Sequence, residues 1–304
     1  MTPNSTHCPD WATALLHGFS QIFLQRHALC GVLCLLAVLC SAPALLGGAL
    51  LGGVAGLLTA QRRGYPKAER EAGLYSYNGV LLGLLLPQVL PWSVLLVPLI
   101  IAGGGLSAML VRQWLKRAPN PTCLPAYTAP FIALGWLLLS TAELPAAAPL
   151  AALPVNGMSL LLALFKGLGQ VMLLEAPLAG VLIGAGLLLA NRHAAAWALL
   201  GAALGLGAGL LLDAPNQALQ GLYSYNPALA ALALSQQRRQ PWLPLLGIAL
   251  AIVLAPGFAA IGLAALTAPF VLACWLVRAA TRVLQQAARD CAPCATPGNP
   301  PRLR

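Results

Sequence analysis

The segment GLYSYNGVLLGL at residues 73–84 recurs as GLYSYNPALAAL at residues 221–232, an offset of 148. Both copies open an apolar run, and their first six letters are identical. Self-similarity of this kind is the sequence signature of a repeated structural unit. The chain is therefore predicted to contain two copies of one unit.

Two further matches carry the repeat along the chain. HGFSQIFL (17–24) pairs with KGLGQVML (166–173), and LPAYTAPF (124–131) pairs with LAALTAPF (263–270). The motifs stand in the same order in both halves. We expect the chain to divide into a first repeat half at 1–150, a second at 151–285 and a disordered tail at 286–304.

Composition places this chain among integral membrane proteins. Hydrophobic residues make up 59% of its 304 residues, charged residues make up 8%, and the mean hydropathy is +0.80. A soluble domain carries about a quarter charged residues. The apolar runs are rich in Leu, Ala and Gly and lack the strict alternation of a barrel strand. Because only helices and closed barrels satisfy the backbone within lipid, we predict an all-α polytopic membrane protein.

The apolar runs predict ten spans, five in each half. They lie at 28–41, 43–60, 72–87, 92–111, 124–141, 176–190, 194–212, 221–235, 242–256 and 261–277. Several are shorter than the ~20 residues of a perpendicular helix, so broken or tilted helices are expected. An amphipathic segment precedes each set, at 12–25 and at 157–174. Glycine pairs at small-xxx-small spacing predict close helix contacts at Gly52, Gly56, Gly201 and Gly205.

The distribution of positive charge predicts the topology. Alternate connections contain Lys and Arg, whereas the intervening turns near 42, 88–91, 142–156, 213–220 and 257–260 contain none. By the positive-inside rule, both termini are cytoplasmic. Because five spans is an odd number, the second half enters from the opposite side, which predicts an inverted repeat about a pseudo-two-fold axis in the membrane plane. The net charge of +10 lies in these connections, which argues against nucleic-acid binding.

The residues that characterise several classes of protein are missing from this sequence. The spans do not carry the chain of ionisable groups expected of a proton-coupled pump. Motifs of the P-loop, HExxH and GxSxG kinds are missing, and no paired-carboxylate site is evident, so we expect no enzyme, no catalytic residues and no cofactor. Cys291 and Cys294 form a CAPC pair without the second pair that a zinc site needs, so no metal is expected.

Two symmetric pairs of polar residues are the candidate site. Gln21 and Gln170 lie midway along the amphipathic segments, where an amide either stabilises helix contacts or lines a pore with neutral hydrogen-bonding groups. Thr128 and Thr267 each precede Ala-Pro-Phe. Either each satisfies a helix start, or the inverted repeat brings both hydroxyls together near the midplane.

For several neighbouring residues, too, the sequence allows either a structural role or a role in a pore. Phe131 and Phe270 are either core residues or the rings of a stacked slot. Asn78 and Asn226 are best explained as helix caps, because turn-forming Gly or Pro follows them. The tyrosines of the two YSYN motifs are expected in an interfacial belt; they are Tyr75, Tyr77, Tyr223 and Tyr225.

Taken together, the GxxQ segment, the YxYNG and YxYNP pair and the twice-used TxPF resemble the urea transporter family. The resemblance covers about 11–278. It implies ten spans, two tilted re-entrant helices and a homotrimer in which each protomer has its own central pore. It also implies passive, channel-like transport through a narrow slot, which is lined by successive hydrogen-bonding oxygen atoms and flanked by Phe rings. The implied pore residues are Gln21 and Gln170 near the mouths, Thr128 and Thr267 at the centre, and Phe131 and Phe270.

The chain departs from the family pattern at three places. Leu24 stands three residues after the first Gln, where relatives often carry Phe, and Leu173 is its counterpart. Gln170 replaces a Glu of some members, and the second LPxxT motif is LAALT.

The resemblance as a whole leads us to expect a urea channel of the bacterial inner membrane. The open alternatives are a channel for short amides, ammonia or water, and a scaffold or sensor whose path is blocked at Leu24 and Leu173.

Overall fold

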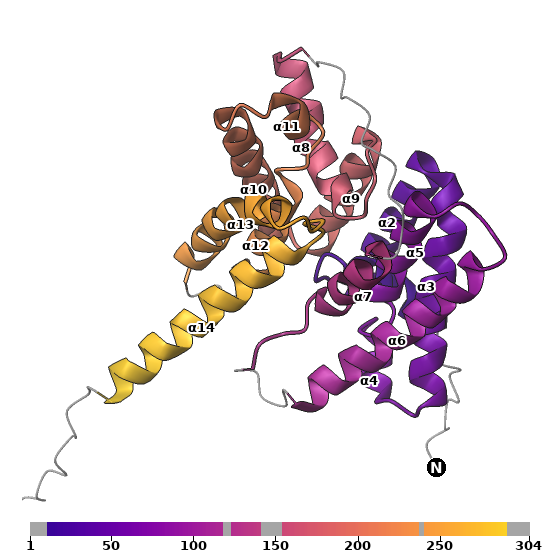
Figure 1. Ribbon diagram of the computed structural model, residues 1–304. Coiled ribbons are helices and arrows are strands. Elements are labelled where there is room, and N and C mark those ends of the chain that lie inside the picture. The colour runs from indigo at the N-terminus through magenta and orange to yellow at the C-terminus, as the bar shows by residue number, and fades with distance from the viewer. Residues whose placement is uncertain (1–10, 118–122, 141–153, 237–239, 291–304) are drawn as a thin grey trace, which may run out of the picture.

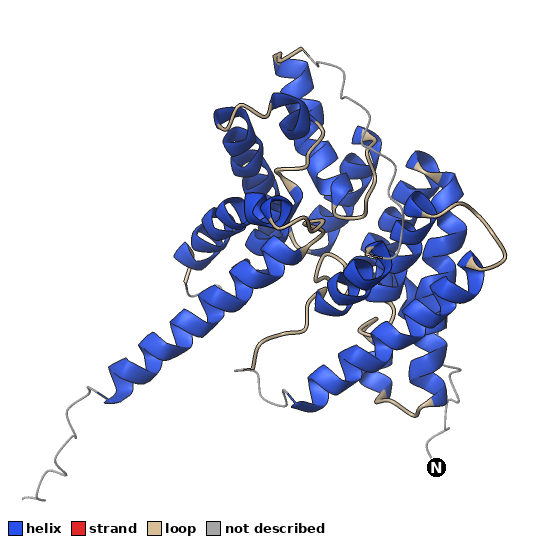
Figure 2. Ribbon diagram, in the orientation of Figure 1, coloured by secondary structure: helices blue, strands red, loops and turns tan. Residues whose placement is uncertain are grey.

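The computed structural model describes residues 11–117, 123–140, 154–236 and 240–290. Every regular element in these segments is a helix, and they contain no strand (Figure 2). The predicted all-α class is therefore confirmed for the described part of the chain.

The helices of the first half follow the predicted runs closely. Both ends of the run at 28–41 coincide with those of a helix, and the others differ by a few residues. In chain order the helices are α1 (Trp11–Gln21), α2 (Ala28–Ser41), α3 (Pro43–Arg62), α4 (Lys67–Glu71), α5 (Tyr77–Val89), α6 (Leu96–Arg117) and α7 (Ala129–Leu139).

The second half repeats this series. It consists of α8 (Gly157–Gln170), α9 (Pro177–Ala190), α10 (Arg192–Leu211), α11 (Pro215–Leu219), α12 (Tyr225–Ser235), α13 (Trp242–Ala260) and α14 (Ala268–Asp290). The last helix extends into the predicted tail as far as Asp290 and away from the other helices (Figure 1). The rest of that tail, with Cys291 and Cys294, lies outside the described residues.

Helix length separates two groups among the apolar helices. In the described part of the chain, four are long and apolar enough to cross a membrane, namely α3, α6, α10 and α13. Shorter apolar helices, α2, α5, α7 and α9, have 11 to 14 residues. At 1.5 Å per residue such helices span about 16–21 Å, less than the ~30 Å hydrocarbon core. The chain is thus a polytopic helical membrane protein in which several apolar helices are shorter than the hydrocarbon core is thick.

Glycine contacts hold neighbouring helices close together. A Cβ atom at Gly52 of α3 would lie 2.1 Å from the carbonyl oxygen of Gly79 in α5. At Gly201 of α10 it would lie 2.6 Å from the carbonyl oxygen of Pro227 in α12. Both predicted glycine pairs therefore lie where two backbones touch.

The two halves meet along α2 with α9 and along α7 with α14. Trp136 of α7 donates its indole N–H to the carbonyl of Ala264, 2.8 Å away. Trp275 of α14 donates to the carbonyl of Pro125, also at 2.8 Å. Each half thus donates to the other the same kind of bond that it accepts. These matching contacts lie where α7 and α14 meet.

Candidate functional site

The two threonines of the TAPF motifs meet where the two parts of the chain come together. Thr128 Oγ1 and Thr267 Oγ1 lie 2.7 Å apart, within hydrogen-bond distance. Both residues are only 3% exposed. The structure thus joins two hydroxyls from opposite halves, 139 residues apart in the chain, in one buried contact.

A left-handed residue before each threonine sets this geometry. Tyr127 has φ 43° and Leu266 has φ 42°, values that side-chain-bearing residues seldom adopt. The hydroxyl of Tyr77 donates to the carbonyl of Tyr127. The hydroxyl of Tyr225 donates to the carbonyl of Leu266 at 2.7 Å. The second tyrosine of each YSYN motif therefore stabilises the turn that presents a threonine.

The asparagine of each motif caps the helix that follows the threonine. Asn78 Oδ1 accepts from the backbone N–H of Phe131 at 3.2 Å, and Asn226 Oδ1 accepts from that of Phe270 at 3.2 Å. The asparagines act as caps, but the prediction is wrong about the helices: they cap α7 and α14 and not α5 and α12, the helices that they begin. An N-cap acceptor normally comes from the residue just before the helix; here it comes from a neighbouring helix.

The prediction of an interfacial tyrosine belt is wrong for the first YSYN motif. Tyr75 is 1% exposed and Tyr77 is 6% exposed. A buried tyrosine hydroxyl usually has a hydrogen-bond partner, and both residues find one within the protein. Hydropathy could not reveal these partners, because it does not record which polar groups meet in the folded chain.

A cavity of about 240 Å³ is lined by Tyr127, the residue that precedes Thr128, and neither threonine is among its lining residues. We call it the Arg278 vestibule; its lining includes Gln21, Leu24, Tyr77, Tyr127, Gln236 and Arg278. Its polar groups are amides, hydroxyls and one guanidinium. In the described part of the chain, no three His, Cys, Asp or Glu side chains gather as metal ligands would.

The loops after α1 and α8 carry a second symmetric contact. Leu24 and Leu173 have φ 58° and 59°. The carbonyl of Leu24 accepts from Gln236 Nε2 at 3.4 Å, and that of Leu173 accepts from Gln88 Nε2 at 3.5 Å. Each amide thus reaches the loop of the other half.

Sequence reasoning missed Gln88 and Gln236. The available signal was their spacing, because the two glutamines are 148 residues apart, the same offset as the YSYN motifs. Gln170 lies elsewhere, with its Nε2 donating to the carbonyl of Gln220 at 3.1 Å. The structure therefore places Gln21 in the vestibule and Gln170 in a contact within the second half, without joining the two.

The phenylalanines are packed within the protein. Phe131 and Phe270 are each 1% exposed, and neither lines the Arg278 vestibule. The Phe270 ring lies 5.0 Å from the ring of Tyr127, centroid to centroid. Leu266 occupies the position equivalent to Tyr127 in the second half. The ring contact of Tyr127 consequently has no aromatic counterpart at Leu266.

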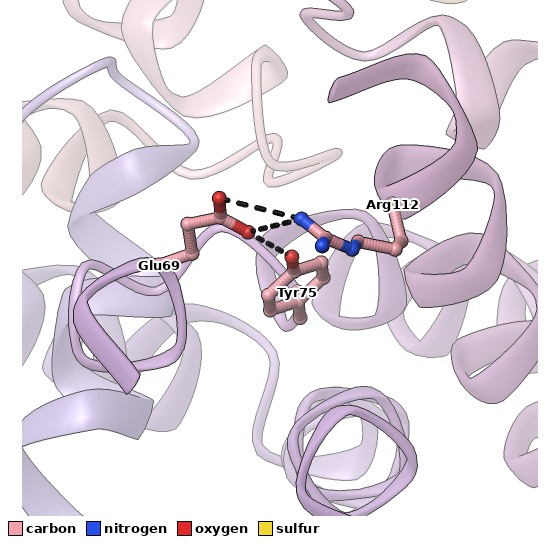
Figure 3. A network of polar contacts seen from close by, with 3 residues as sticks. All are labelled: Glu69, Tyr75 and Arg112. Atoms are coloured by element: carbon pink, nitrogen blue, oxygen red, sulfur yellow. Dashed lines mark hydrogen bonds and ion pairs between the residues drawn. The ribbon is translucent and has the colours of Figure 1, made fainter. Parts of the chain in front are cut away.

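An ion pair holds α6 beside the vestibule (Figure 3). The carboxylate of Glu69 accepts from Arg112 Nη1 at 3.3 and 3.5 Å and from the Tyr75 hydroxyl. Burial, and secondly this carboxylate, raises the pKa of Tyr75, which therefore remains a neutral donor. Two residues of α6 flanking Arg112 line the vestibule, Val111 and Leu115. The network thereby fixes one wall of the cavity.

Comparison with known proteins agrees with the family resemblance found in the sequence motifs. The family model described as urea transporter matches residues 12–282. Urea transporter 1 of Ovis aries is 27% identical over 252 residues, covering 76% of this chain and 64% of the sheep protein. Urea transporter 1 of Capra hircus is 28% identical with the same coverage, and that of Mus musculus is 28% identical over 74% of this chain. The chain spans less than two thirds of the length of these curated relatives.

Proposed function

Since the chain belongs to the urea transporter family, we propose that it carries urea passively across a membrane. The contact between Thr128 and Thr267 is the observation that carries this proposal. It supports a pore on the pseudo-two-fold, reached on one side through the Arg278 vestibule. The mechanism is that of a channel and needs no ion gradient.

Urea imposes a clear requirement on such a pore. It is small, planar and neutral, with four N–H donors and one carbonyl. Leaving one polar group unpaired in an apolar environment costs roughly 2–7 kcal/mol. The pore must therefore offer hydrogen-bond acceptors along its length, and these must bind weakly enough to let the solute leave.

The threonine pair suits this requirement. Either hydroxyl can act as the donor in their mutual hydrogen bond. A urea N–H can therefore take the place of the partner hydroxyl, and the threonine oxygen then accepts from the solute. Because both oxygens are neutral, the solute exchanges one hydrogen bond for another and meets no deep charge-stabilised trap.

We assign the remaining site residues by position. Gln21 and Gln170 supply amide oxygens towards the two mouths, and Phe131 and Phe270 form apolar walls behind the threonines. The loops at Leu24 and Leu173 border the mouths with backbone carbonyls. Gln21 and Leu24 line the Arg278 vestibule, which supports this assignment on that side.

The proposal includes the topology and the assembly. The second half is inverted with respect to the first, both termini are cytoplasmic, and the membrane is the inner membrane of a bacterium. The protein forms a homotrimer with one pore per protomer. Native mass spectrometry of the purified protein measures the assembly; a monomer as the main species would contradict the trimer.

Stopped-flow light scattering of vesicles tests the transport function. An inward urea gradient first shrinks the vesicles, and their reswelling reports urea permeability. We expect vesicles containing the protein to reswell faster than empty vesicles. Gln21→Leu and Gln170→Leu should each lower urea permeability about 2- to 10-fold, because each variant loses one ordinary hydrogen bond to the solute. Gln217→Leu is the matched control, because Gln217 is exposed on α11 and lies outside the proposed pore.

Three outcomes would overturn parts of this proposal. Equal reswelling of protein-containing and empty vesicles would exclude a urea channel and favour the scaffold or sensor. A larger increase over empty vesicles in the permeation of acetamide, ammonia or water than in that of urea would point to a channel for those solutes instead. Unchanged permeability in both glutamine variants would remove their assigned role.

A further inference from the structure

Arg278 gives the vestibule a fixed positive charge. This residue of α14 lines the cavity together with Gln21, Tyr127 and Gln236. Its guanidinium carbon lies 5.9 Å from the centroid of the Tyr127 ring. A guanidinium over an aromatic face is attracted by the negative face of the ring. The guanidinium is thus held at the wall of the vestibule beside Tyr127, the residue that precedes Thr128.

This charge has no counter-charge near it in the described part of the chain. Arg112, on the neighbouring helix α6, is paired with Glu69, and Lys67 is paired with Glu71. Arg278 forms no such pair with a described carboxylate, and its buried Nε has no hydrogen-bond partner there. Among the residues that the structure describes, no acidic side chain lines the vestibule.

The charge is also confined to one side of the pseudo-two-fold. Thr128 and Thr267 are equivalent at an offset of 139, so the position equivalent to Arg278 is residue 139, which is a leucine. The second half of the repeat therefore carries a cation where the first half has an apolar side chain.

We propose that Arg278 is a specificity-determining residue that excludes planar cations from this mouth of the pore. This inference rests on the proposed urea transport. Guanidinium is the informative competitor, because it has the size and trigonal planar shape of urea but carries a positive charge. Shape and hydrogen-bond donors alone would admit both molecules. A like charge placed against the wrong ligand is a common way to obtain specificity.

The size of the effect follows from the dimensions of the cavity. A cation inside the vestibule would lie roughly 7 Å from the Arg278 guanidinium, and at an effective dielectric constant of about 20 their repulsion weakens binding on the order of 10- to 100-fold. Neutral urea experiences no such repulsion. The residue therefore discriminates by charge while its neighbours provide hydrogen bonds.

Inhibition of urea flux by guanidinium tests the proposal. Vesicles are equilibrated with guanidinium chloride on both sides, so that the orientation of the protein does not matter, and sodium chloride provides the ionic-strength control. Each variant is compared with its own uninhibited urea flux. We expect Arg278→Gln to be inhibited at guanidinium concentrations about 10- to 100-fold lower than wild type. Arg278→Lys, which keeps the charge, should resemble wild type.

Arg282→Gln is the matched control. Arg282 lies one turn further along the same helix and does not line the vestibule. Its replacement removes the same charge from α14 but should leave guanidinium inhibition at the wild-type level. If Arg282→Gln sensitised the protein as strongly as Arg278→Gln, the effect would belong to the overall charge of the helix, and the proposal would be wrong.

Equilibrium binding separates this proposal from the transport function. Labelled guanidinium is bound to the purified protein in detergent, which requires no flux. Tighter binding to Arg278→Gln than to wild type supports the proposal even if urea does not permeate. Equal binding and equal inhibition in wild type and Arg278→Gln would overturn it, while normal urea flux in wild type would leave the transport function intact.

Discussion

At the scale of single residues, the hydroxyl contact between Thr128 and Thr267 is expected to contribute to the stability of the fold. Each threonine is buried, and in the described structure each is the other's side-chain partner. An unpaired hydroxyl at such a place costs free energy, whereas removing both partners leaves nothing unpaired. The pair therefore has a measurable energetic signature that is independent of transport.

A double-mutant cycle should reveal that signature. Thr128→Val and Thr267→Val preserve shape and remove one hydroxyl each. We expect each single variant to lose about 1–3 kcal/mol of stability, because the remaining hydroxyl is left buried without its partner. Thr128→Val/Thr267→Val should be more stable than the sum of the single losses implies. Thermal unfolding in detergent measures stability, and strictly additive losses would contradict the pairing.

The same variants should separate stability from transport. If the hydroxyls accept hydrogen bonds from urea, the double variant should have the lowest urea permeability of the three, although its stability is partly restored. Stopped-flow reswelling of vesicles measures this. A double variant that is both stable and fully permeable would show that the threonines hold the halves together without serving the solute.

At the scale of the element, hydropathy located the helices but not where several of them begin. The run predicted at 72–87 becomes α5 only from Tyr77, because Gly73 has φ 76° and starts a turn. The run at 221–235 becomes α12 only from Tyr225, and Gly221 has φ 81°. An apolar turn and an apolar helix have the same hydropathy. The shortening was therefore invisible to a pattern of apolar letters.

Helix contacts in this protein also depend on glycines with no room for a side chain. A Cβ atom at Gly31 of α2 would lie 2.0 Å from the carbonyl oxygen of Leu16, and one at Gly180 of α9 would lie 1.7 Å from that of Phe165. These contacts press the amphipathic helices α1 and α8 onto their following helices. The proposed re-entrant segments thus depend on direct backbone contact.

Alanine at these glycines should be costly. Gly31→Ala and Gly180→Ala should each destabilise the protein by about 1–3 kcal/mol or more, because backbone must move to admit the methyl group. Gly47→Ala is the matched control: nothing lies within 4 Å of a Cβ there, so this variant should be neutral or about 0.5–1 kcal/mol more stable. Thermal unfolding of the three variants measures the difference. Equal stability for all three would argue against close packing of α1 and α8.

For the whole molecule, the repeat is expressed in reciprocal contacts. Trp136 and Trp275, Thr128 and Thr267, and the amides of Gln88 and Gln236 all contact the opposite half in matching ways. The two halves also differ at particular residues. These differences include the charge of Arg278, the ring of Tyr127 and the Glu69–Arg112 pair. Such departures make the two mouths of the proposed pore chemically different.

Cysteine labelling tests the proposed inversion. Arg63 and Leu212 are equivalent at an offset of 149, and both are exposed beside a helix end. On a background without the native cysteines, we expect Leu212→Cys in intact spheroplasts to react with a membrane-impermeant thiol reagent. Arg63→Cys should react only after permeabilisation, because an inverted repeat puts equivalent residues on opposite sides. Reaction of both from the same side would contradict the inversion.

The sequence by itself determined the class, the duplication and the positions of the helices, because each depends on local composition or on letters that recur along the chain. It also determined the four residues Gln21, Gln170, Thr128 and Thr267 as candidates. Only the tertiary structure decided which of them meet, and it joined the threonines but not the glutamines. It alone revealed the vestibule around Arg278 and the capping of α7 and α14 by asparagines of other helices. The physical reason is that these contacts join segments 40 or more residues apart, and their geometry depends on left-handed turns and on backbone contact at glycines, neither of which hydropathy records.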